Sequence, residues 1–539
     1  MFEQLTSFAR KFVAVLIAWT TVLGTSSALA QSPSEQTATP IQHLVIIFQE
    51  NVSFDHYFGT YPNALNPAGE PSFHARPGTP TVNGLNGALL SNNPNLLNSA
   101  NGAGASNPFR LDRRQAATAD QGHGYTQEQA AFHSGLLDLF PVSVGTAGPP
   151  PNAPPSIVTT KGLTMGYYDG NTVTALWNYA QRFAMSDNSY DTVFGPSTPG
   201  LMNLVAGQTN GVSQTLNGTG SETDGGNGTL TVIGDPDPIG DICSAPKRNQ
   251  VQMGSRNIGD LLSAAGVTWG SFMGGFDLTV TNANGTTGCV RSTVSAYTGT
   301  VTDYIPHHAF FQYYASTANP NHTRPGSIAE IGHDGRANHQ YDINDFFAAV
   351  QAGNFPAVSF VKALAYQDGH AGYSDPLDEQ TFLVNIVNFL QRSPEWASTA
   401  VVVLYDDSDG WYDHQMGPIV NQSTSPADAL TGPGACGNGA TALPGIDSTN
   451  PHAQGRCGYG PRQPLLVISP WAKQNFVDHT VTDQTSVLRF IEDNWLGGQR
   501  IGQGSFDSLA NSITQMFDFR APRNSGRLFL DPITGEPMD

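Results

Sequence analysis

The sequence predicts an α/β fold, with a central, mostly parallel sheet, helices on both faces and long loop insertions. Short continuous runs of valine, isoleucine and leucine alternate along the chain with segments that keep helical apolar spacing. Continuous apolar runs are typical of parallel strands that are buried on both faces. Glycine (58 residues) and proline (37 residues) are abundant, which indicates many turns and long irregular connections between these elements.

The individual elements follow from these patterns. Strands are predicted at residues 42–48, 357–361, 399–405 and 464–469. Helices are predicted at residues 171–183, 342–352, 377–390 and 485–496. No repeat of fixed period stands out. Residues 31–539 are therefore expected to form a single domain, with a small insertion or subdomain around residues 207–300.

Residues 1–30 have the layout of a secretory signal peptide. The basic pair Arg10-Lys11 precedes an apolar run at residues 12–24, and a small-x-small triplet ends at Ala30. The protein is therefore expected to be secreted or periplasmic after cleavage near Ala30. A retained membrane anchor is the alternative, but the apolar run is shorter than the roughly 20 residues of a spanning helix. No other segment is long enough, so the mature protein is expected to have no integral membrane segment.

The charge of the chain excludes one class of partner. The formal net charge is −20, and only 13% of the residues are charged. A surface of this sign repels DNA, RNA and anionic lipid headgroups, so no nucleic-acid partner is expected. Divalent cations and neutral or zwitterionic partners remain compatible with it. The composition indicates no particular oligomeric state.

Four cysteines, an even number in an exported chain, predict two disulfides. Three pairings are possible, and proximity in the sequence favours Cys243–Cys289 and Cys436–Cys457. The spacing matches no zinc-binding pattern. We therefore interpret the cysteines as staples of turn-rich loops.

Acidic residues follow two of the predicted strands, with Glu50 after the first and Asp406 and Asp407 after the run at 399–405. Ligands of open α/β sheets bind beyond the carboxyl ends of the strands, so these side chains are expected to converge. Converging carboxylates repel one another unless a cation or a proton compensates them. A hard divalent metal ion, with the Asn51 carbonyl as a neutral oxygen ligand, meets this requirement. Helix N-capping is the alternative for each acid taken alone.

A serine and several histidines are candidates for the chemistry. Ser197 lies in the segment 194–200 (FGPSTPG), where a tight turn presents its hydroxyl as a candidate nucleophile. Turn formation alone explains the same composition. The adjacent pair His307-His308, with His123 and His370, lies in turn-rich surroundings, where a loop lets both members of the pair reach one ligand. A lone histidine is more often a packed or surface residue than a catalytic one.

Seven segments together resemble the bacterial phosphoesterase family. That family contains the phosphatidylcholine-hydrolysing phospholipases C and a group of secreted acid phosphatases. The first segment is Val45–Gly59 (VIIFQENVSFDHYFG), and the last is Val477–Ile491 (VDHTVTDQTSVLRFI). The others, in the order of the family, are MGYY at 165–168, Asp187-Asn188, GPSTP at 195–199, YDDSDGWYDH at 405–414 and PLLVISPW at 464–471.

The resemblance implies a fold similar to alkaline phosphatase, a three-layer sandwich formed by one phosphoesterase catalytic domain. It implies Ser197 as the nucleophile beside one or more divalent metal ions. The metal ligands that it implies are Glu50, Asn51, Asp406, Asp407 and Ser197. The histidines that it implies for binding phosphoryl oxygens are His123, His307, His308 and His370. The identity of the metal stays open, because all-oxygen ligation suits Mg²⁺, Ca²⁺ or Mn²⁺ and related sites hold zinc or iron.

The sequence departs from the family at two of these segments. Gly200-Leu201 stands where the family often has Asn-Arg, and 406–410 reads DDSDG where many members have DEHGG. These changes bear on the substrate more than on the reaction. The chain also ends soon after the last segment, whereas the larger phospholipases of the family carry further C-terminal β domains, which favours the shorter phosphatase-like form.

The expected function is therefore a secreted, metal-dependent phosphoester hydrolase with a phosphoseryl intermediate, and acid phosphatase activity on small phosphomonoesters is favoured. A phospholipase C that cleaves phosphatidylcholine-type phosphodiesters is the alternative. Because protonated histidines bind phosphate best, a mildly acidic pH optimum is expected. A sulfatase is disfavoured because Leu201 stands where its turn needs arginine. A secreted binding or adhesive protein is the non-enzymatic alternative, favoured by the loops rich in glycine, asparagine and threonine.

Overall fold

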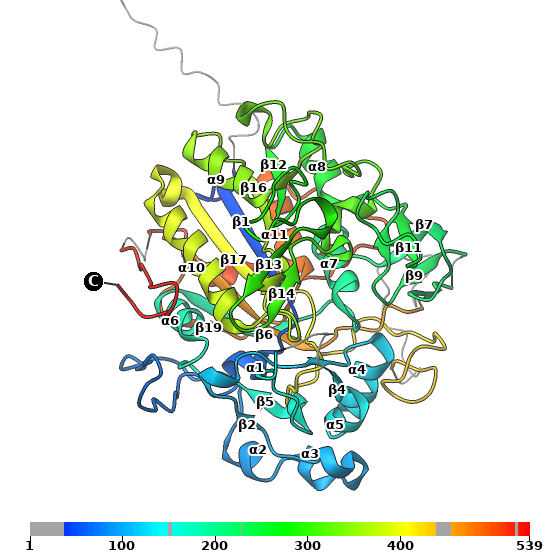
Figure 1. Ribbon diagram of the computed structural model, residues 1–539, viewed down its shortest axis with the longest axis vertical. Coiled ribbons are helices and arrows are strands. Elements are labelled where there is room, and N and C mark those ends of the chain that lie inside the picture. The colour runs from blue at the N-terminus through cyan, green and yellow to red at the C-terminus, as the bar shows by residue number, and fades with distance from the viewer. Residues whose placement is uncertain (1–36, 149–153, 227, 438–453, 523–525, 539) are drawn as a thin grey trace, which may run out of the picture.

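The computed structural model describes residues 37–148, 154–226, 228–437, 454–522 and 526–538; the expected signal peptide lies outside these ranges. A nine-stranded sheet forms the centre of the molecule (Figure 1). Its strands, in spatial order, are β15 (Gln340–Asp342), β12 (Trp269–Met273), β16 (Val358–Lys362), β1 (His43–Gln49), β17 (Thr399–Tyr405), β18 (Arg462–Ile468), β6 (Ala184–Tyr190) and β19 (Phe476–Asp478), with β20 (Thr482–Asp483) also paired to β6.

The middle of the sheet is parallel and fully buried. In β1, Ile46 aligns with Phe360 of β16 on one side and with Val402 of β17 on the other, and all three side chains are completely buried. This burial on both faces is what the continuous apolar runs predict. Because β1, β16 and β17 run in the same direction, their carboxyl ends meet at one edge of the sheet.

β18 is the exception in direction. It pairs antiparallel with both β17 and β6, so the expectation that the run at 464–469 belongs to the parallel set was wrong. The reason is that every residue of β18 is buried, and burial produces the same apolar run in either direction. The reversal puts the first residue of β18, Arg462, at the edge where β17 ends.

Helices cover both faces of this sheet. On one face α7 (Ser197–Ala206) contacts α8 (Ile258–Ala264) and α11 (Thr485–Trp495). On the other face α10 (Pro376–Arg392) contacts α6 (Thr174–Arg182) and packs Phe389 against Phe347 of α9 (Ile343–Gln351), with ring centroids 4.9 Å apart (Figure 1). The short helix α1 (Phe54–Phe58) follows β1 and packs on β18. The predicted α/β architecture, with helices on both faces of a mostly parallel sheet, is confirmed.

The loop insertions form small structures of their own. Residues 210–253 contain a five-stranded sheet with the order β10 (Asp237–Pro238), β11 (Gln250–Met253), β7 (Asn210–Leu216), β9 (Leu230–Val232) and β8 (Glu222–Asp224). The range 207–300 also contains α8 and β12, which belong to the main body. The two-stranded sheets are β13 (Ser292–Ser295) with β14 (Gly299–Thr302), β2 (Phe109–Arg110) with β5 (Gly166–Tyr167), and β3 (Asp120–Gln121) with β4 (Thr146–Gly148).

A group of short helices lies at the lower end of Figure 1. It consists of α2 (Gly87–Ser91), α3 (Pro94–Leu97), α4 (Tyr125–Phe132) and α5 (Phe140–Ser143). This lobe reaches the main sheet through the segment between β3 and α4, which carries His123. The lobe therefore contributes to the carboxyl edge from outside the sheet.

Two disulfides staple the loops as predicted. Cys243 is bonded to Cys289, and Cys436 is bonded to Cys457. The first joins loops on the side of the small sheet, and the second lies in the long connection between β17 and β18. Among the described residues no helix has the length and apolar character needed to cross a membrane.

Candidate active site

Three parallel strands deliver charged side chains to one edge of the sheet. β1 is followed by Glu50, β17 is followed by Asp406 and Asp407, and β16 ends at Lys362. All four side chains are buried, with Lys362 only 1% exposed. The pairing of Gln49 with Tyr405 places Glu50 and the two aspartates at the same edge of the sheet. Lys362 ends a strand at this edge as well, and the sequence reasoning missed it.

Ser197 is the first residue of α7, and the N-terminal end of this helix faces the same edge. Close packing of α7 against the loop after β17 requires Gly200. A Cβ atom at that position would lie 2.0 Å from the Asp406 carbonyl oxygen. Glycine at 200, one of the two departures from the family pattern, thus allows the helix to reach the acidic loop.

The hydroxyl of Ser197 points to Glu50. It donates a hydrogen bond to Glu50 Oε2 at 3.1 Å, and Ser197 is only 2% exposed. The other oxygen, Oε1, forms an ion pair with Lys362 and lies 3.2 Å from His308 Nδ1. Glu50 therefore connects the candidate nucleophile to a buried cation and a buried imidazole.

The acidic loop after β17 is held by its own backbone. Asp406 Oδ1 accepts hydrogen bonds from the N–H groups of Asn51 at 3.0 Å and Asp407 at 2.8 Å, and Asp407 Oδ1 accepts one from the Asp409 N–H at 2.7 Å. Asn51 itself adopts a left-handed backbone conformation (φ 64°), which asparagine tolerates better than most residues. These bonds fix one oxygen of each carboxylate.

The remaining oxygens of this loop have no partner within the described ranges. They are Asn51 Oδ1, Asp406 Oδ2, Asp407 Oδ2 and Asp409 Oδ2, all of which are buried. Buried polar atoms are nearly always paired, so four unpaired oxygens in one place can be satisfied by a bound cation or by water. A hard divalent cation prefers such oxygen donors. Asn51, Asp406 and Asp407, with Glu50 and the Ser197 hydroxyl adjacent, are therefore a donor set that fits a metal ion.

Burial dominates the electrostatics of the loop. It raises the pKa of Asp407 well above its ordinary value, because the charged form is desolvated and Asp406 and Glu128 lie near, although His123 acts in the opposite direction. It also raises the pKa of Asp406, against the effect of Lys362. Burial lowers the pKa of Lys362, and the surrounding aspartates reduce this effect. A divalent cation would favour the charged forms of the carboxylates.

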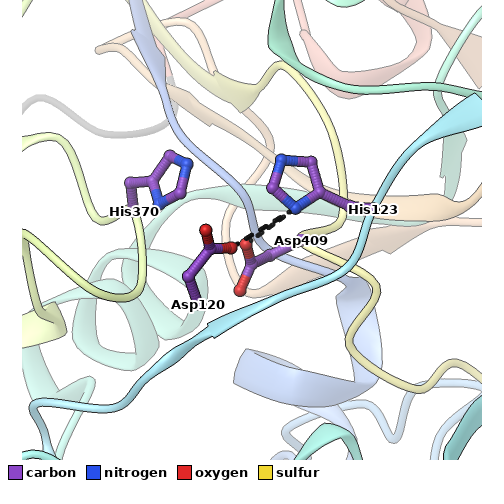
Figure 2. A group of neighbouring side chains, drawn as sticks. All are labelled: Asp120, His123, His370 and Asp409. Carbon is purple, nitrogen blue, oxygen red and sulfur yellow. Dashed lines mark ion pairs between the residues drawn. The ribbon is translucent and has the colours of Figure 1, made fainter. Parts of the chain in front are cut away.

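Two of the predicted histidines lie together with two carboxylates on the side of the lobe. Figure 2 shows His123 and His370 above Asp120 and Asp409, with the two rings 5.6 Å apart between centroids. His123 Nδ1 lies 3.1 Å from Asp409 Oδ1 and 3.6 Å from Asp120 Oδ1. The Asn51 side-chain amide contacts both His123 and Asp409, at 3.4 and 3.2 Å, so this group adjoins the metal-binding donor set.

The histidines of the site differ in charge. Burial lowers the pKa of His123, but Asp407, Asp409 and Asp120 outweigh it and hold this pKa well above its ordinary value. Burial lowers the pKa of His370 to about 4. The pKa of His308 is lowered well below its ordinary value by burial and by the neighbouring His307 and His370. His123 is therefore the one of these three that is expected to carry a charge near neutral pH.

The pair His307-His308 lies in a single 3-10 turn, in agreement with the expectation that the two histidines lie in a loop or turn. The rings stand perpendicular, 4.6 Å apart between centroids. Only the second member contacts Glu50. The first points toward Asp237, with 3.8 Å between His307 Nδ1 and Asp237 Oδ1, and its carbonyl accepts a hydrogen bond from Tyr313.

A second residue that sequence reasoning missed is Glu128 of α4. Its Oε2 accepts the Gly195 N–H at 3.0 Å, and its Oε1 accepts the Ser408 hydroxyl at 2.6 Å. Burial raises the pKa of Glu128 to about 7. Glu128 thus ties the turn before Ser197 to the acidic loop, and no local pattern in its helix signals this role.

Comparison with known proteins identifies the family. The model of the phosphoesterase family matches residues 41–496, which is most of the chain. The chain belongs to the phosphoesterase family. It is therefore a hydrolase that acts on phosphoric ester bonds, and the interpretation as a non-enzymatic binding protein is set aside.

Relatives of this phosphoesterase include bacterial and plant proteins. Phospholipase C B of Mycobacterium tuberculosis is 24% identical over 516 residues, which cover 94% of this chain and 82% of the relative. Hemolytic phospholipase C of Pseudomonas aeruginosa is 23% identical and covers 92% of this chain and 58% of the relative. Non-specific phospholipase C6 of Arabidopsis thaliana is 22% identical and covers 84% and 66%.

Among solved structures the likeness is weaker. A protein of the alkaline phosphatase superfamily from Vibrio parahaemolyticus matches with 14% identity and a TM-score of 0.26, covering 76% of this chain and 77% of that one. Murine ectonucleotide pyrophosphatase/phosphodiesterase 5 matches with 12% identity and a TM-score of 0.29, covering 64% and 95%. Such scores support no conclusion about the site of this phosphoesterase, whose fold rests on the sheet described above.

Proposed function

We propose that this phosphoesterase hydrolyses phosphate monoesters by metal-assisted displacement at Ser197, through a phosphoseryl intermediate, after export from the cell. One observation carries the proposal. The Ser197 hydroxyl lies 3.1 Å from Glu50 Oε2, beside an acidic loop whose second carboxylate oxygens have no partner among the described residues. The two disulfides fit an exported protein, since such bonds persist in oxidising compartments.

In the proposed reaction the Ser197 oxygen attacks phosphorus, so that the Oγ–P bond forms while the bond to the leaving oxygen breaks. Glu50 Oε2 accepts the hydroxyl hydrogen bond, orients the nucleophile and takes its proton as the Oγ–P bond forms. The N-terminal end of α7 places its partial positive charge near the developing phosphoryl charge. A metal ion held by Asn51, Asp406 and Asp407 would act as a Lewis acid toward the phosphoryl oxygens and lower the pKa of the serine hydroxyl.

His123 is proposed to supply the proton that the leaving oxygen needs. It is held in its charged form by Asp407 and Asp409, and its side chain is 12% exposed. Water then attacks the phosphoseryl group and gives a proton to His123, which is neutral after the first step. The serine oxygen leaves and regains its proton from Glu50 as the product phosphate forms. His307, His308 and His370 are proposed to contact the other phosphoryl oxygens.

The choice of monoesters rests on the depth of the nucleophile. Ser197 is 2% exposed, whereas the side chains of His123 and His307 above it are 12% and 16% exposed. A terminal phosphoryl group with one substituent reaches such a nucleophile with its leaving group directed outward. A diester needs room for substituents on two oxygens.

Phospholipase C activity is the second candidate. It is favoured by the relatives, which carry this name and align over most of the chain. Zwitterionic phosphatidylcholine is also compatible with a chain of net charge −20, whereas anionic lipid is not.

A substrate panel tests both candidates. Purified mature protein is assayed with p-nitrophenyl phosphate, p-nitrophenyl phosphorylcholine, p-nitrophenyl sulfate and phosphatidylcholine vesicles, with and without chelator. We expect the monoester to give the highest kcat/KM and chelation to abolish turnover. Preferential cleavage of phosphorylcholine esters would favour the phospholipase, and full activity after chelation would contradict the metal-assisted mechanism.

The nucleophile is tested by Ser197→Ala, with Ser508→Ala, at an exposed position of a 3-10 turn, as the matched control. Loss of a nucleophile that acts with its partners as one unit costs several orders of magnitude in kcat, on the order of 10⁴-fold or more. We expect the control to keep its activity. A phosphoserine trapped at residue 197 by acid quench and located by mass spectrometry would support the intermediate directly.

A further inference from the structure

Lys362 is a cation that the proposed reaction leaves without a role. It ends β16, the strand next to β1, and it is almost fully buried among acids. Its ammonium pairs with Glu50, and Asp368, Asp406 and Asp407 lie close enough to act on it electrostatically. A lysine is rarely buried to this extent unless its charge is compensated.

The carboxylates around Lys362 form a second donor group, separate from the unpaired oxygens of the acidic loop. Glu50, His308 and Asp368 each offer one ligand atom, and these three atoms lie within 4.8 Å of one another. His308 Nδ1 is 3.2 Å from Glu50 Oε1 and 3.8 Å from Asp368 Oδ2. Two carboxylates and an imidazole in this geometry are a donor set for a divalent ion.

The ammonium of Lys362 already contacts this donor group. It pairs with Glu50 Oε1, the same oxygen that His308 approaches, while Oε2 faces Ser197. One oxygen of Glu50 is thus taken by a protein cation, and the other remains on the side of the nucleophile.

We propose that Lys362 is a built-in second cation, which fills the donor group of Glu50, His308 and Asp368 and restricts the chain to one divalent metal ion. The inference rests on the proposed metal site at Asn51, Asp406 and Asp407. Lys362 is a positioning residue in this scheme: it fixes Glu50 and balances charge, and it takes no part in bond making.

The physical argument is one of charge balance. Buried carboxylates require compensation, and a protein ammonium, a proton or a metal ion can provide it. Replacing Lys362 by neutral methionine of similar length removes one positive charge and opens the space beside Glu50. The donor group of Glu50, His308 and Asp368 is then both vacant and more negative, which favours uptake of a second divalent ion.

Metal counting tests the proposal without reference to activity. Wild-type protein and variants are stripped with chelator, reloaded with excess Mn²⁺, passed through gel filtration and analysed by elemental mass spectrometry. We expect one Mn²⁺ per chain in the wild type and two in Lys362→Met. We expect one in Lys362→Arg, which keeps the charge, and one in Lys473→Met, the matched control beyond the opposite edge of the sheet.

Two further measurements locate the second ion. The double variant Lys362→Met/His308→Asn should return to one Mn²⁺ per chain, since it lacks the imidazole donor. In Lys362→Met alone, electron paramagnetic resonance should show exchange coupling between neighbouring Mn²⁺ ions, whereas the wild type should show the signal of an isolated ion.

The outcomes separate this inference from the proposed function. Two ions in the wild type, or one ion in a folded Lys362→Met variant, would overturn the role of Lys362 and leave the metal-assisted reaction standing. No bound ion in the wild type would overturn both. If Lys362→Met does not fold, the wild-type count still tests the proposal, because two Mn²⁺ ions beside an intact Lys362 would overturn it.

Discussion

The segment 405–414 supplies two buried acidic clusters that are compensated in opposite ways. At its end, Asp413 joins Asp55, and Arg462 donates hydrogen bonds to both carboxylates at 3.1 to 3.2 Å. At its beginning, Asp406 and Asp407 each use one oxygen for backbone N–H groups and keep the other unpaired in the part of the chain that the structure describes. One cluster is complete within the protein, and the other needs a ligand.

We interpret the cluster of Asp55, Asp413 and Arg462 as structural, and the cluster of Asp406 and Asp407 as the proposed reactive cluster. Arg462 is completely buried, and it also donates to the carbonyls of Asn83 and Asp187, so its guanidinium is fully used. Within the described residues no comparable cation is bonded to Asp406 Oδ2 or Asp407 Oδ2. Burial without internal pairing costs stability, and proteins retain it where a ligand or a reaction requires it.

The largest effect is expected at the reactive cluster. Asp407→Asn removes a proposed metal ligand, and we expect kcat to fall on the order of 10³-fold, because the charge stabilisation of the phosphoryl group is lost. The stability of the metal-free protein should stay the same or rise, since the pKa of Asp407 is raised by burial and by neighbouring acids. Turnover of p-nitrophenyl phosphate and urea unfolding in chelator measure the two effects. A variant with full activity would remove Asp407 from the site.

The second-largest effect is expected at the cluster of Asp55, Asp413 and Arg462, which we call the paired cluster. It is an effect on the free energy of unfolding, not on activity. Arg462→Met removes the cation that donates to both Asp55 and Asp413 and leaves only His414 beside these buried acids, and breaking a buried pair in this way typically costs about 3–5 kcal/mol. Urea unfolding of wild type and variant measures the loss. Arg520→Met is the matched control, because Arg520 forms its ion pair at the surface and should cause no measurable change. An unchanged midpoint for Arg462→Met would contradict the distinction between the clusters.

Candidate site residues that directly follow a strand could be predicted from the sequence. Residues that reach the site only through tertiary packing could not. Glu50 and Asp406 follow apolar runs that are visible without a structure. Lys362 also directly follows a predicted strand, the run at 357–361. The charged residue after that run was visible in the sequence but was not considered. Glu128 carries no such signal, because only the packing of the lobe against the main body brings α4 to Ser408.

The fold was predictable to a similar degree. The strand at 399–405 and the helices at 342–352 and 377–390 were predicted within about two residues of their observed bounds. β6 was missed although it belongs to the main sheet, because its residues (AMSDNSY) are largely polar and lack an apolar run. The direction of β18 could not be read either, because a strand buried on both faces has the same composition in both orientations.

A buried carboxylate can also be neutralised by a proton. For Glu379 this predicts that stability depends on pH. Glu379 accepts hydrogen bonds from Tyr57 at 2.8 Å and Tyr405 at 2.7 Å, and burial raises its pKa from 4.5 to about 7. A raised carboxyl pKa stabilises the protonated fold, so this contribution is present at low pH and lost as the pH rises toward 7. A shift of this size corresponds to ~3 kcal/mol.

Glu379→Gln, which stays neutral at every pH, isolates this contribution. We expect the difference in unfolding free energy between variant and wild type to grow in favour of the variant from pH 5 to pH 8, by at most ~3 kcal/mol. Urea unfolding in chelator across this range measures it. A difference that does not change with pH would show that Glu379 is charged in the folded protein, and the proton would be excluded as its compensation.

The smallest effect is expected at the rim of the paired cluster. His414 Nδ1 lies 2.6 Å from Asp55 Oδ2; burial lowers the pKa of His414, but Asp55 and Asp413 outweigh it and hold this pKa above its ordinary value. A raised histidine pKa contributes stability that is complete below pH ~6.5 and lost as the pH rises through the folded value. Since the side chain is partly exposed, His414→Gln should cost only about 1 kcal/mol at pH 5.5 and less at pH 9. A loss that is larger at pH 9 than at pH 5.5 would contradict stabilisation of the paired cluster by the charged form of His414.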